Sequence, residues 1–261
     1  MNRPVAAGLL GIAVLAAACE RGSNPYAGIS ENWPTGSSAI LATGLVAAYD
    51  METGTGDGLL RDFSGHGHHG AVRQTVLADG RFGQARVFAT VDDQIDLPER
   101  PTFDLDGPLT VATWVRVRTV DLHQHIFACD DKFALWITPQ SQFRLDDTQG
   151  NGFSTLPGSV EPGTWYSVVA MLHATRGDSL TEENIEIYVN GEPTQGTADP
   201  TWSSTVLHPS DACHIGFESH QGNAVHQLLP FDGIIDELLV FDRVLTPHEI
   251  SAHAYHLPVE R

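Results

Sequence analysis

The segment from Phe231 to Ile250 constrains the fold of this chain more than any other. It opens with an Asp-Gly turn pair and continues as an apolar run of strand length, Ile234–Phe241. A threonine cap, a proline and a glutamate three residues after the cap then predict a short helix over 246–255. A buried strand followed directly by a capped helix is expected to close a β-core.

This apolar run contains two carboxylates, Asp236 and Glu237. Burying a carboxylate is costly unless a cation or strong hydrogen-bond donors meet it. The strand is therefore both a core strand and a candidate metal-binding edge. Because neighbouring side chains of a strand alternate, we expect the two carboxylates to point to opposite faces.

Other short strands are predicted along the rest of the chain, separated by turn signals such as Asn190-Gly191. Apart from the terminal strand over 234–241, they span residues 45–50, 86–89, 94–97, 109–117, 125–129, 133–137, 142–145, 165–172, 185–189 and 214–217. Many short strands with one convincing helix are typical of an antiparallel β-sandwich. No internal repeat or break in composition divides them, which indicates one domain.

Seven motifs in the expected order carry a family resemblance. They are Gly44–Tyr49, Asp62–Gly70, Phe82–Ala85, Leu109–Val115, Pro162–Tyr166, Ile187–Gly191 and Phe231–Ile250. Together they resemble the laminin-G-like, concanavalin A-like lectin/glucanase domains of exported bacterial proteins. The resemblance covers roughly residues 44 to 255 and implies an all-β fold, an antiparallel two-sheet jelly-roll β-sandwich. Such relatives include lectins, carbohydrate-binding modules and some glycoside hydrolases, so the fold does not give the function.

The N-terminus predicts export. Residues 1–19 combine a positive Arg3, an apolar run too short to span a bilayer and small residues before Cys19, as in a signal peptide with a lipobox-like end. Lipidation of Cys19 would anchor the protein in the bacterial cell envelope. Ala16 stands where a lipobox usually has leucine, and an ordinary signal peptide of a secreted protein is the alternative. Residues 20–40 read as a flexible tether and residues 41–258 as the folded domain.

The net charge disfavours some classes of partner, and the cysteines permit a disulfide. The formal net charge is −19, which disfavours nucleic acid and anionic lipid and suits cations or neutral sugars. Membrane contact is therefore expected only through the lipid anchor. In an exported protein Cys129 and Cys213 are permitted to form a disulfide, with two unpaired buried thiols as the alternative.

The resemblance also implies a calcium site. Asp62 and Asp236 would supply carboxylates, and the backbone around His66 and His68 would supply carbonyls. In the family, asparagines stand where this chain has the two histidines, and imidazole is a poor calcium ligand. The alternatives are an Asx-type turn in which backbone amides satisfy Asp62, and a zinc or copper site on the histidines.

Sugar binding is predicted at exposed aromatics and turn carboxylates. Trp202 lies in a polar loop, and Asp130 and Asp131 lie near a predicted hairpin turn, where they would contact sugar hydroxyls or a cation. Trp114 and Trp165 match packing positions of the family. Trp136 stands in an apolar strand and is expected in the core.

No catalytic signature accompanies these features. The chain lacks a Glu-x-Asp-x-x-Glu strand, a Gly-x-Ser-x-Gly elbow and a His-Glu-x-x-His helix. We therefore predict a non-catalytic cell-surface module that recognises carbohydrate with the help of a structural calcium ion. A protein-binding adhesion or scaffold module is the first alternative, and a glycoside hydrolase-like enzyme is the second.

Overall fold

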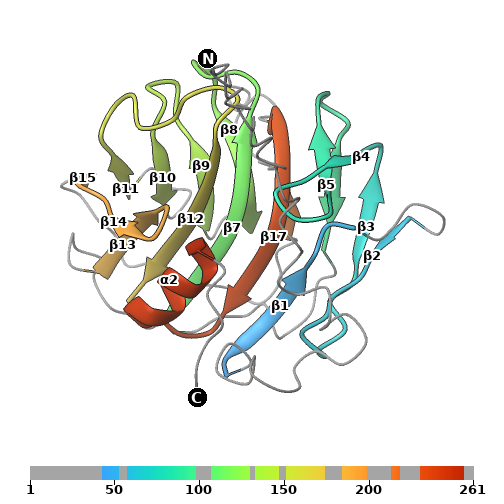
Figure 1. The fold of residues 1–261 in the computed structure, drawn as a ribbon, viewed down its shortest axis with the longest axis horizontal. Helices are drawn as coiled ribbons and strands as arrows, with labels where there is room; N and C mark the ends of the chain where they lie inside the picture. The colour runs from blue at the N-terminus through green and yellow to red at the C-terminus, as the bar shows by residue number, and fades with distance from the viewer. Residues whose placement is uncertain are drawn as a thin grey trace, which may run out of the picture.

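The computed structural model describes residues 43–52, 58–97, 107–129, 133–146, 151–173, 184–198, 213–217 and 230–255. These residues form two antiparallel β-sheets packed face to face, with one described helix on the outside (Figure 1). The predicted β-sandwich is confirmed. The expected signal peptide, Cys19 and the tether lie outside the described residues.

One sheet has eight strands and contains the longest strands of the chain. Seven of them follow the order β14-β13-β12-β7-β17-β5-β4, and β1 pairs with β17 beside β5. Their bounds are β1 Leu45–Tyr49, β4 Val76–Asp79, β5 Gln84–Phe88, β7 Leu109–Val117, β12 Trp165–Leu172, β13 Ile185–Val189, β14 Glu192–Pro193 and β17 Gly233–Phe241. The terminal strand β17 therefore lies inside the sheet, as its apolar sequence predicted.

The other sheet has nine strands in the order β15-β11-β10-β9-β8-β16-β6-β3-β2. Their bounds are β2 Leu59–Leu60, β3 Gly70–Arg73, β6 Gln94–Asp96, β8 Gln124–Cys129, β9 Phe133–Ile137, β10 Phe143–Asp146, β11 Gly152–Thr155, β15 Gly196–Ala198 and β16 Cys213–Ile215. Strand β16 pairs with β8 on one side and with β6 on the other, far from both in sequence.

The main core fills the space between the sheets. Alternate residues of each strand enter it, for example Val111 and Val115 of β7 and Leu135 and Ile137 of β9. The remaining residues of each strand face outward, because successive side chains of a strand point to opposite faces. This alternation decides which side chains each sheet presents on its outer face.

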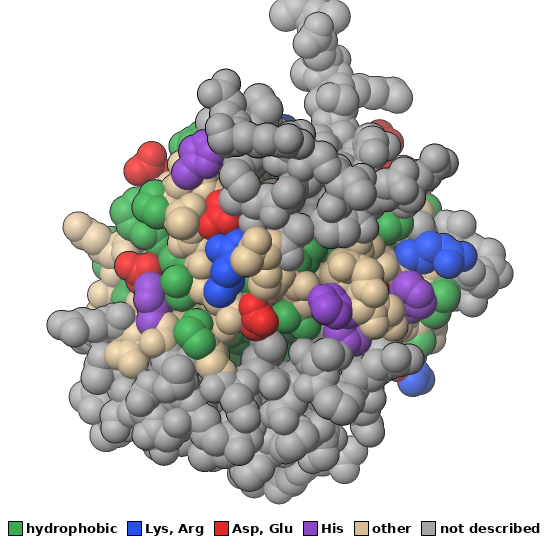
Figure 2. Space-filling view, turned by 90° about the horizontal axis from the view of Figure 1, so that it is seen from below, with side chains coloured by type: hydrophobic (Ala, Val, Ile, Leu, Met, Phe, Trp, Pro, Cys, Tyr) green, Lys and Arg blue, Asp and Glu red, His purple; other side chains and the backbone are tan. Residues whose placement is uncertain are grey.

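Helix α2, Pro247–Tyr255, lies over the outer face of the eight-stranded sheet, in front of β12, β7 and β17 (Figure 1). It seals a second apolar cluster that includes Leu239, Phe241 and Ile250. Seen from the end of the molecule where α2 and β1 lie, the described hydrophobic, acidic, basic and histidine side chains are interspersed (Figure 2). Within the described residues, no helix is long and apolar enough to cross a membrane.

The predicted start of α2 is present in atomic detail. The Thr246 hydroxyl accepts the Glu249 amide at 3.3 Å, and the Glu249 carboxylate accepts the Thr246 amide at 2.8 Å, which completes a capping box. Arg243 adds an ion pair to Glu249 at 2.6 Å. Glu249 is almost fully buried, so these donors satisfy a carboxylate that water does not reach.

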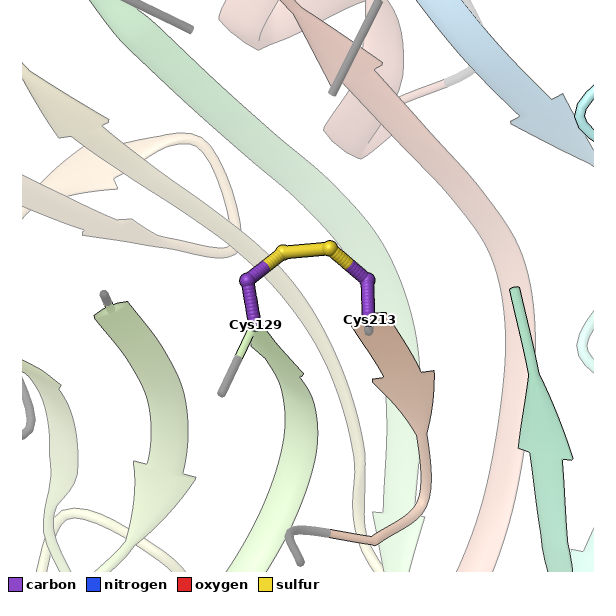
Figure 3. Close-up of a disulfide and its surroundings, with 2 residues drawn as sticks. All are labelled: Cys129 and Cys213. Atoms are coloured by element: carbon purple, nitrogen blue, oxygen red, sulfur yellow. A yellow bond between two sulfur atoms is a disulfide. The ribbon is translucent and has the colours of Figure 1, made fainter. Parts of the chain in front are cut away.

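A disulfide joins Cys129 at the end of β8 to Cys213 at the start of β16 (Figure 3). The two residues stand directly opposite each other in the pairing of these strands, and both side chains enter the main core. The bond closes a sequence separation of 84 residues. It covalently fixes the late strand β16 in the middle of the nine-stranded sheet.

Candidate functional site

The loop that carries Asp62 is held together by its own hydrogen bonds. The Asp62 carboxylate accepts the Ala48 amide at 3.0 Å, the Ser64 amide at 2.9 Å, the Ser64 hydroxyl at 2.8 Å and the His68 amide at 2.8 Å. Both of its oxygens thus receive two donors. This arrangement is the Asx-type turn that the sequence left as the alternative to a metal site.

The two loop histidines are likewise engaged in the loop's structure. The Nδ1 atom of the His68 ring lies 3.0 Å from the Val46 carbonyl oxygen. The backbone carbonyl of His68 accepts a hydrogen bond from the Tyr49 hydroxyl at 2.6 Å. The His66 ring stacks on the His68 ring with centroids 5.9 Å apart. Since the Asp62 carboxylate is saturated by protein donors, the loop does not fit a calcium ion bound through that side chain.

Asp236 has different partners from Asp62. One of its carboxylate oxygens accepts the amides of Arg81 and Phe82 at 2.8 and 3.0 Å. Among the described residues, no three histidine, cysteine or acidic side chains converge in a metal-binding group. The expected set of Asp62, His66, His68 and Asp236 is therefore not assembled around one ion position.

The expectation that Asp236 and Glu237 point to opposite faces rested on regular alternation, which fails here. The register of β17 against β7 shifts between Asp236 and Leu239, and Glu237 adopts a positive φ of 48°. This is a β-bulge, which breaks the alternation of side chains at that point. The sequence pattern gave no sign of it.

The predicted ligand-binding residues Asp130, Asp131 and Trp202 lie outside the described residues. Asp130 and Asp131 directly follow the disulfide-bonded Cys129 in sequence.

The outer face of the nine-stranded sheet carries a row of polar and aromatic side chains. His125 of β8, Trp136 of β9, Arg144 of β10 and Ser154 of β11 occupy consecutive register positions. The inward partners Phe143 and Leu145 belong to the main core, so the row faces away from it. Trp136 is thus half-buried on an outer face, and the prediction that it lies in the core was wrong.

Trp136 is the centre of this row. The exposed His123 stacks on its ring at a centroid distance of 4.8 Å, and His125 stacks at 5.6 Å. The Arg144 guanidinium lies 5.9 Å from the ring centroid on the neighbouring strand. We call these residues, together with Asp146, the Trp136 cluster.

Asp146 ties the Trp136 cluster together. Its carboxylate accepts the indole N–H of Trp136 at 3.0 Å and the Arg144 Nε–H at 3.0 Å. Burial raises the pKa of Asp146, and the guanidinium of Arg144 opposes that rise. Arg144 also donates to the Ser154 hydroxyl at 2.8 Å. An aromatic plane is thereby held rigidly among fixed donors and acceptors.

A second row on the same face contains two acids that lie far apart. Asp96, His214, Ala128, Ala134 and Asp146 occupy consecutive register positions on β6, β16, β8, β9 and β10. Four strand spacings separate Asp96 from Asp146, or about 19 Å. The carboxyl pairs of glycosidases lie about 5–10 Å apart, so these two acids do not flank one glycosidic bond.

The Trp136 cluster combines groups of the kinds that sugar-binding sites use. An aromatic ring offers an apolar plane to a sugar, while imidazole, guanidinium and carboxylate groups beside it offer hydrogen bonds to hydroxyls. The sequence did contain a signal for it. Trp136 and Arg144 sit at positions that alternate with the core residues Leu135 and Phe143, which placed both on the outer face.

A family model for the concanavalin A-like lectin/glucanases superfamily matches residues 89–251 of the sequence, more than half of the chain. The chain belongs to this superfamily. The predicted family resemblance is therefore confirmed. A search of curated protein sequences found no match to this chain.

Solved structures with the same fold include three of different origin. Domain 4 of AbnA, a GH43 extracellular arabinanase from Geobacillus stearothermophilus, in complex with arabinotriose, has a TM-score of 0.56 and 20% identity over 80% of this chain and 98% of that domain. Trypanosoma rangeli sialidase has a TM-score of 0.59 and 16% identity over 82% of this chain and 33% of its own. The receptor binding domain of botulinum neurotoxin C/D mosaic serotype has a TM-score of 0.59 and 13% identity over 82% and 51%.

At these identities the likeness shows the fold alone. The chain spans nearly the whole of the arabinanase domain but only about a third of the sialidase and half of the neurotoxin domain. This superfamily member therefore resembles one complete domain and only parts of the larger proteins.

Proposed function

We propose that this protein is a non-catalytic carbohydrate-binding module whose ligand stacks on the Trp136 cluster. The main support for this proposal is a half-buried tryptophan on an outer sheet face, which is hydrogen-bonded to Asp146 and flanked by His123 and Arg144. A stack of aromatic rings held in place by hydrogen bonds suits a sugar ring, since little freedom is lost on binding.

The ligand class favoured by the charges is a neutral oligosaccharide. Arg144 is engaged by Asp146 and Ser154, and the surface as a whole is acidic. An anionic sugar would have to compete with the Asp146 carboxylate for that guanidinium. Arabinotriose is a suitable first probe, because it is the sugar bound in the complex of the similar arabinanase domain.

Isothermal titration of arabinotriose and of a panel of neutral oligosaccharides into the purified protein tests this proposal. Trp136→Ala should weaken binding of the sugar that binds wild type by at least about 10-fold, as expected for a central aromatic contact. Trp165→Ala is the matched control, because Trp165 also lies half-buried under an arginine, Arg116, at 5.1 Å, but on the other sheet. Equal affinity of wild type and Trp136→Ala would contradict the proposal.

Protein recognition is the second candidate, and one observation favours it. The outer face of the eight-stranded sheet carries a row of Trp165, Arg116, Ile234, Val87 and Val76. Val76 is 61% exposed, and the other four are half-buried. Binding lost in Trp165→Ala and kept in Trp136→Ala, with a protein as the ligand, would favour this candidate.

We further propose that the module acts at the cell surface, attached through a lipid on Cys19. The support is the sequence of residues 1–19 and the polar tether that follows. Metabolic labelling with a fatty-acid analogue, compared between wild type and Cys19→Ser, tests it. Label retained in Cys19→Ser would exclude that anchor.

A further inference from the structure

Helix α2 covers only part of the outer face of the eight-stranded sheet. The sheet residues beneath it, such as Leu239 and Phe241, belong to the second apolar cluster. Beyond the helix, strands β12, β7 and β17 continue across the same face (Figure 1). The row of side chains named above as a protein-recognition candidate crosses this further part of the face, and it consists of Trp165, Arg116, Ile234, Val87 and Val76. None of the five is fully buried.

Two arginines on this face lie over tryptophan rings. The half-buried Arg116 has its guanidinium 5.1 Å from the ring centroid of Trp165, its register partner on β12. The exposed Arg81, in the turn between β4 and β5, has its guanidinium 4.8 Å from the ring centroid of Trp114. Trp114 and Arg116 lie on the same face of β7, about 7 Å apart along the strand. The two guanidiniums therefore belong to one surface.

These two arginines lack the acidic partners that others have. Arg118, Arg144 and Arg243 each pair with a carboxylate. Within the described part of the chain, no carboxylate lies within ion-pair distance of Arg81 or Arg116, and neither guanidinium donates a hydrogen bond. The sequence has 33 acidic residues and 14 lysines and arginines, so a shortage of acids does not explain two unpaired guanidiniums.

An arginine placed over an aromatic ring is prepared to bind a carboxylate. The ring contacts the face of the guanidinium, and the N–H donors lie in its plane, where they match the two oxygens of a carboxylate. The contact with the ring also limits the freedom that the side chain loses on binding. Beside the arginines, Ile234, Val87 and Val76 supply apolar contacts. The surface therefore suits a ligand that carries both carboxylates and apolar side chains.

We propose that this surface binds an acidic segment of a partner protein. We call it the Arg81–Arg116 surface, and it comprises Arg81, Arg116, Trp165, Ile234, Val87 and Val76. Carboxylates of the partner would pair with the two guanidiniums, and its apolar side chains would cover the valines and the isoleucine. From Trp165 to Val76 the row crosses four strand spacings, or about 19 Å, which an extended segment of about six residues spans.

The inference rests on the second candidate function, protein recognition, and specifies the chemistry of the partner. It is independent of sugar binding at the Trp136 cluster, which lies on the other sheet. A neutral sugar would leave both guanidiniums without a carboxylate, so the unpaired charge distinguishes the two faces.

Selection from a display library of random peptides, each about six residues long, tests the proposal on the purified protein. Wild type should enrich peptides that combine aspartate or glutamate with apolar residues. Fluorescence anisotropy then measures the affinity of the enriched peptides. The double variant Arg81→Gln with Arg116→Gln should bind them at least about 10-fold more weakly. Added salt should weaken their binding to wild type, because the pairs are exposed.

Arg118→Gln is the matched control for Arg116→Gln. It removes the same charge from an exposed arginine just beyond the end of β7, but that arginine already pairs with Asp232 at 2.5 Å. Arg118→Gln should keep the peptide affinity within about twofold, and so should Trp136→Ala. An unchanged unfolding temperature of the double variant shows that its loss of binding is not a loss of fold.

Three outcomes would overturn the proposal. Enriched peptides without acidic residues would contradict the partner's chemistry and leave protein recognition standing. Acidic peptides that bind the double variant as tightly as wild type would place their site elsewhere. If no peptide is enriched, the second candidate function fails together with this inference, and binding of polygalacturonate in that case would identify an acidic glycan as the ligand instead.

Discussion

The two sheets of this sandwich differ in what covers their outer faces. On the eight-stranded sheet, Leu239 and Phe241 point outward into an apolar cluster that α2 seals with Ile250. On the nine-stranded sheet, the outward positions of β9 and β10 carry Trp136, Arg144 and Asp146, and a disulfide joins β8 to β16 on its inner side. The part of the eight-stranded face under α2 is thus apolar and packed, whereas the described part of the nine-stranded face presents aromatic and polar groups.

The two sheets also differ in how their buried acids are paired. On the nine-stranded sheet, Asp146 accepts a hydrogen bond from the Nε–H of Arg144. Asp96 is paired with His214, whose Nδ1 atom lies 3.0 Å from its carboxylate. On the eight-stranded sheet, Oδ1 of Asp236 and Oε1 of Glu237 have no hydrogen-bond partner among the described residues, although both side chains are buried.

The largest expected effect comes from breaking the sealed face. Phe241→Ala removes a fully buried ring under α2 and should lower the free energy of unfolding by about 3–5 kcal/mol. Trp136→Ala, on the outer face of the nine-stranded sheet, should cost less than half as much, because Trp136 is half-buried. Urea unfolding of both variants measures the difference, and equal losses would refute the division between the faces.

The disulfide cross-links two neighbouring strands of the nine-stranded sheet. Replacing both Cys129 and Cys213 by alanine should lower the free energy of unfolding by about 2–4 kcal/mol, since the bond closes a long loop. Reduction of the wild type with dithiothreitol should give a similar loss. A double variant as stable as the oxidised wild type would show that the bond contributes nothing to the sheet.

Lowering the pH should reduce the free energy of unfolding through His253, which lies under the helix-covered face. This side chain is buried in α2 beside Trp114, and burial lowers its pKa from 6.5 to about 4. The unfolded chain takes up a proton below pH 6.5, whereas the folded protein does not until about pH 4. The stability that depends on a neutral His253 is therefore present above pH 6.5 and is lost as the pH falls, by up to about 3 kcal/mol.

Comparison with His253→Leu isolates this term from the carboxylates, which are common to both proteins. Denaturant unfolding at several pH values between 7 and 4 should show a smaller loss in the variant. If both proteins lose stability in parallel, His253 is not the group responsible.

The smallest effect is expected at the start of α2. Thr246→Ala removes the hydroxyl that caps the helix and should cost about 1 kcal/mol. Ser251→Ala, which also removes a hydroxyl but inside the helix, should be neutral or slightly stabilising. A Thr246→Ala protein as stable as wild type would mean that Arg243 alone holds this end of the helix through Glu249.

The sequence predicted the long strands and the helix well. The ranges 109–117, 133–137, 165–172 and 185–189 coincide with β7, β9, β12 and β13, and the capping box of α2 formed as expected. Each of these elements carries its own signal in apolar residues or in a cap. Short strands such as β2 and β14 were not predicted, because each has only two residues, too few to show an alternating pattern.

The sites were harder to predict, for two physical reasons. Trp136 was assigned to the core because its strand is apolar, although its alternation with Leu135 placed it outside. Asp236 and Glu237 were expected on opposite faces because a bulge leaves no mark in the residue pattern. A sequence shows which face a residue occupies only while the strand remains regular.

The position of β16 has a consequence for how the protein reaches its native state. Five strands of the nine-stranded sheet, from β15 to β8, lie on one side of β16, and β6, β3 and β2 lie on the other. All eight precede Cys213 in the chain, so the sheet stays in two pieces until β16 has been made. Such pairing between distant segments gives a high contact order and slow folding. The face that carries Trp136 is therefore completed only after residue 215 has left the ribosome, which leaves the chain a long interval in an unfolded form.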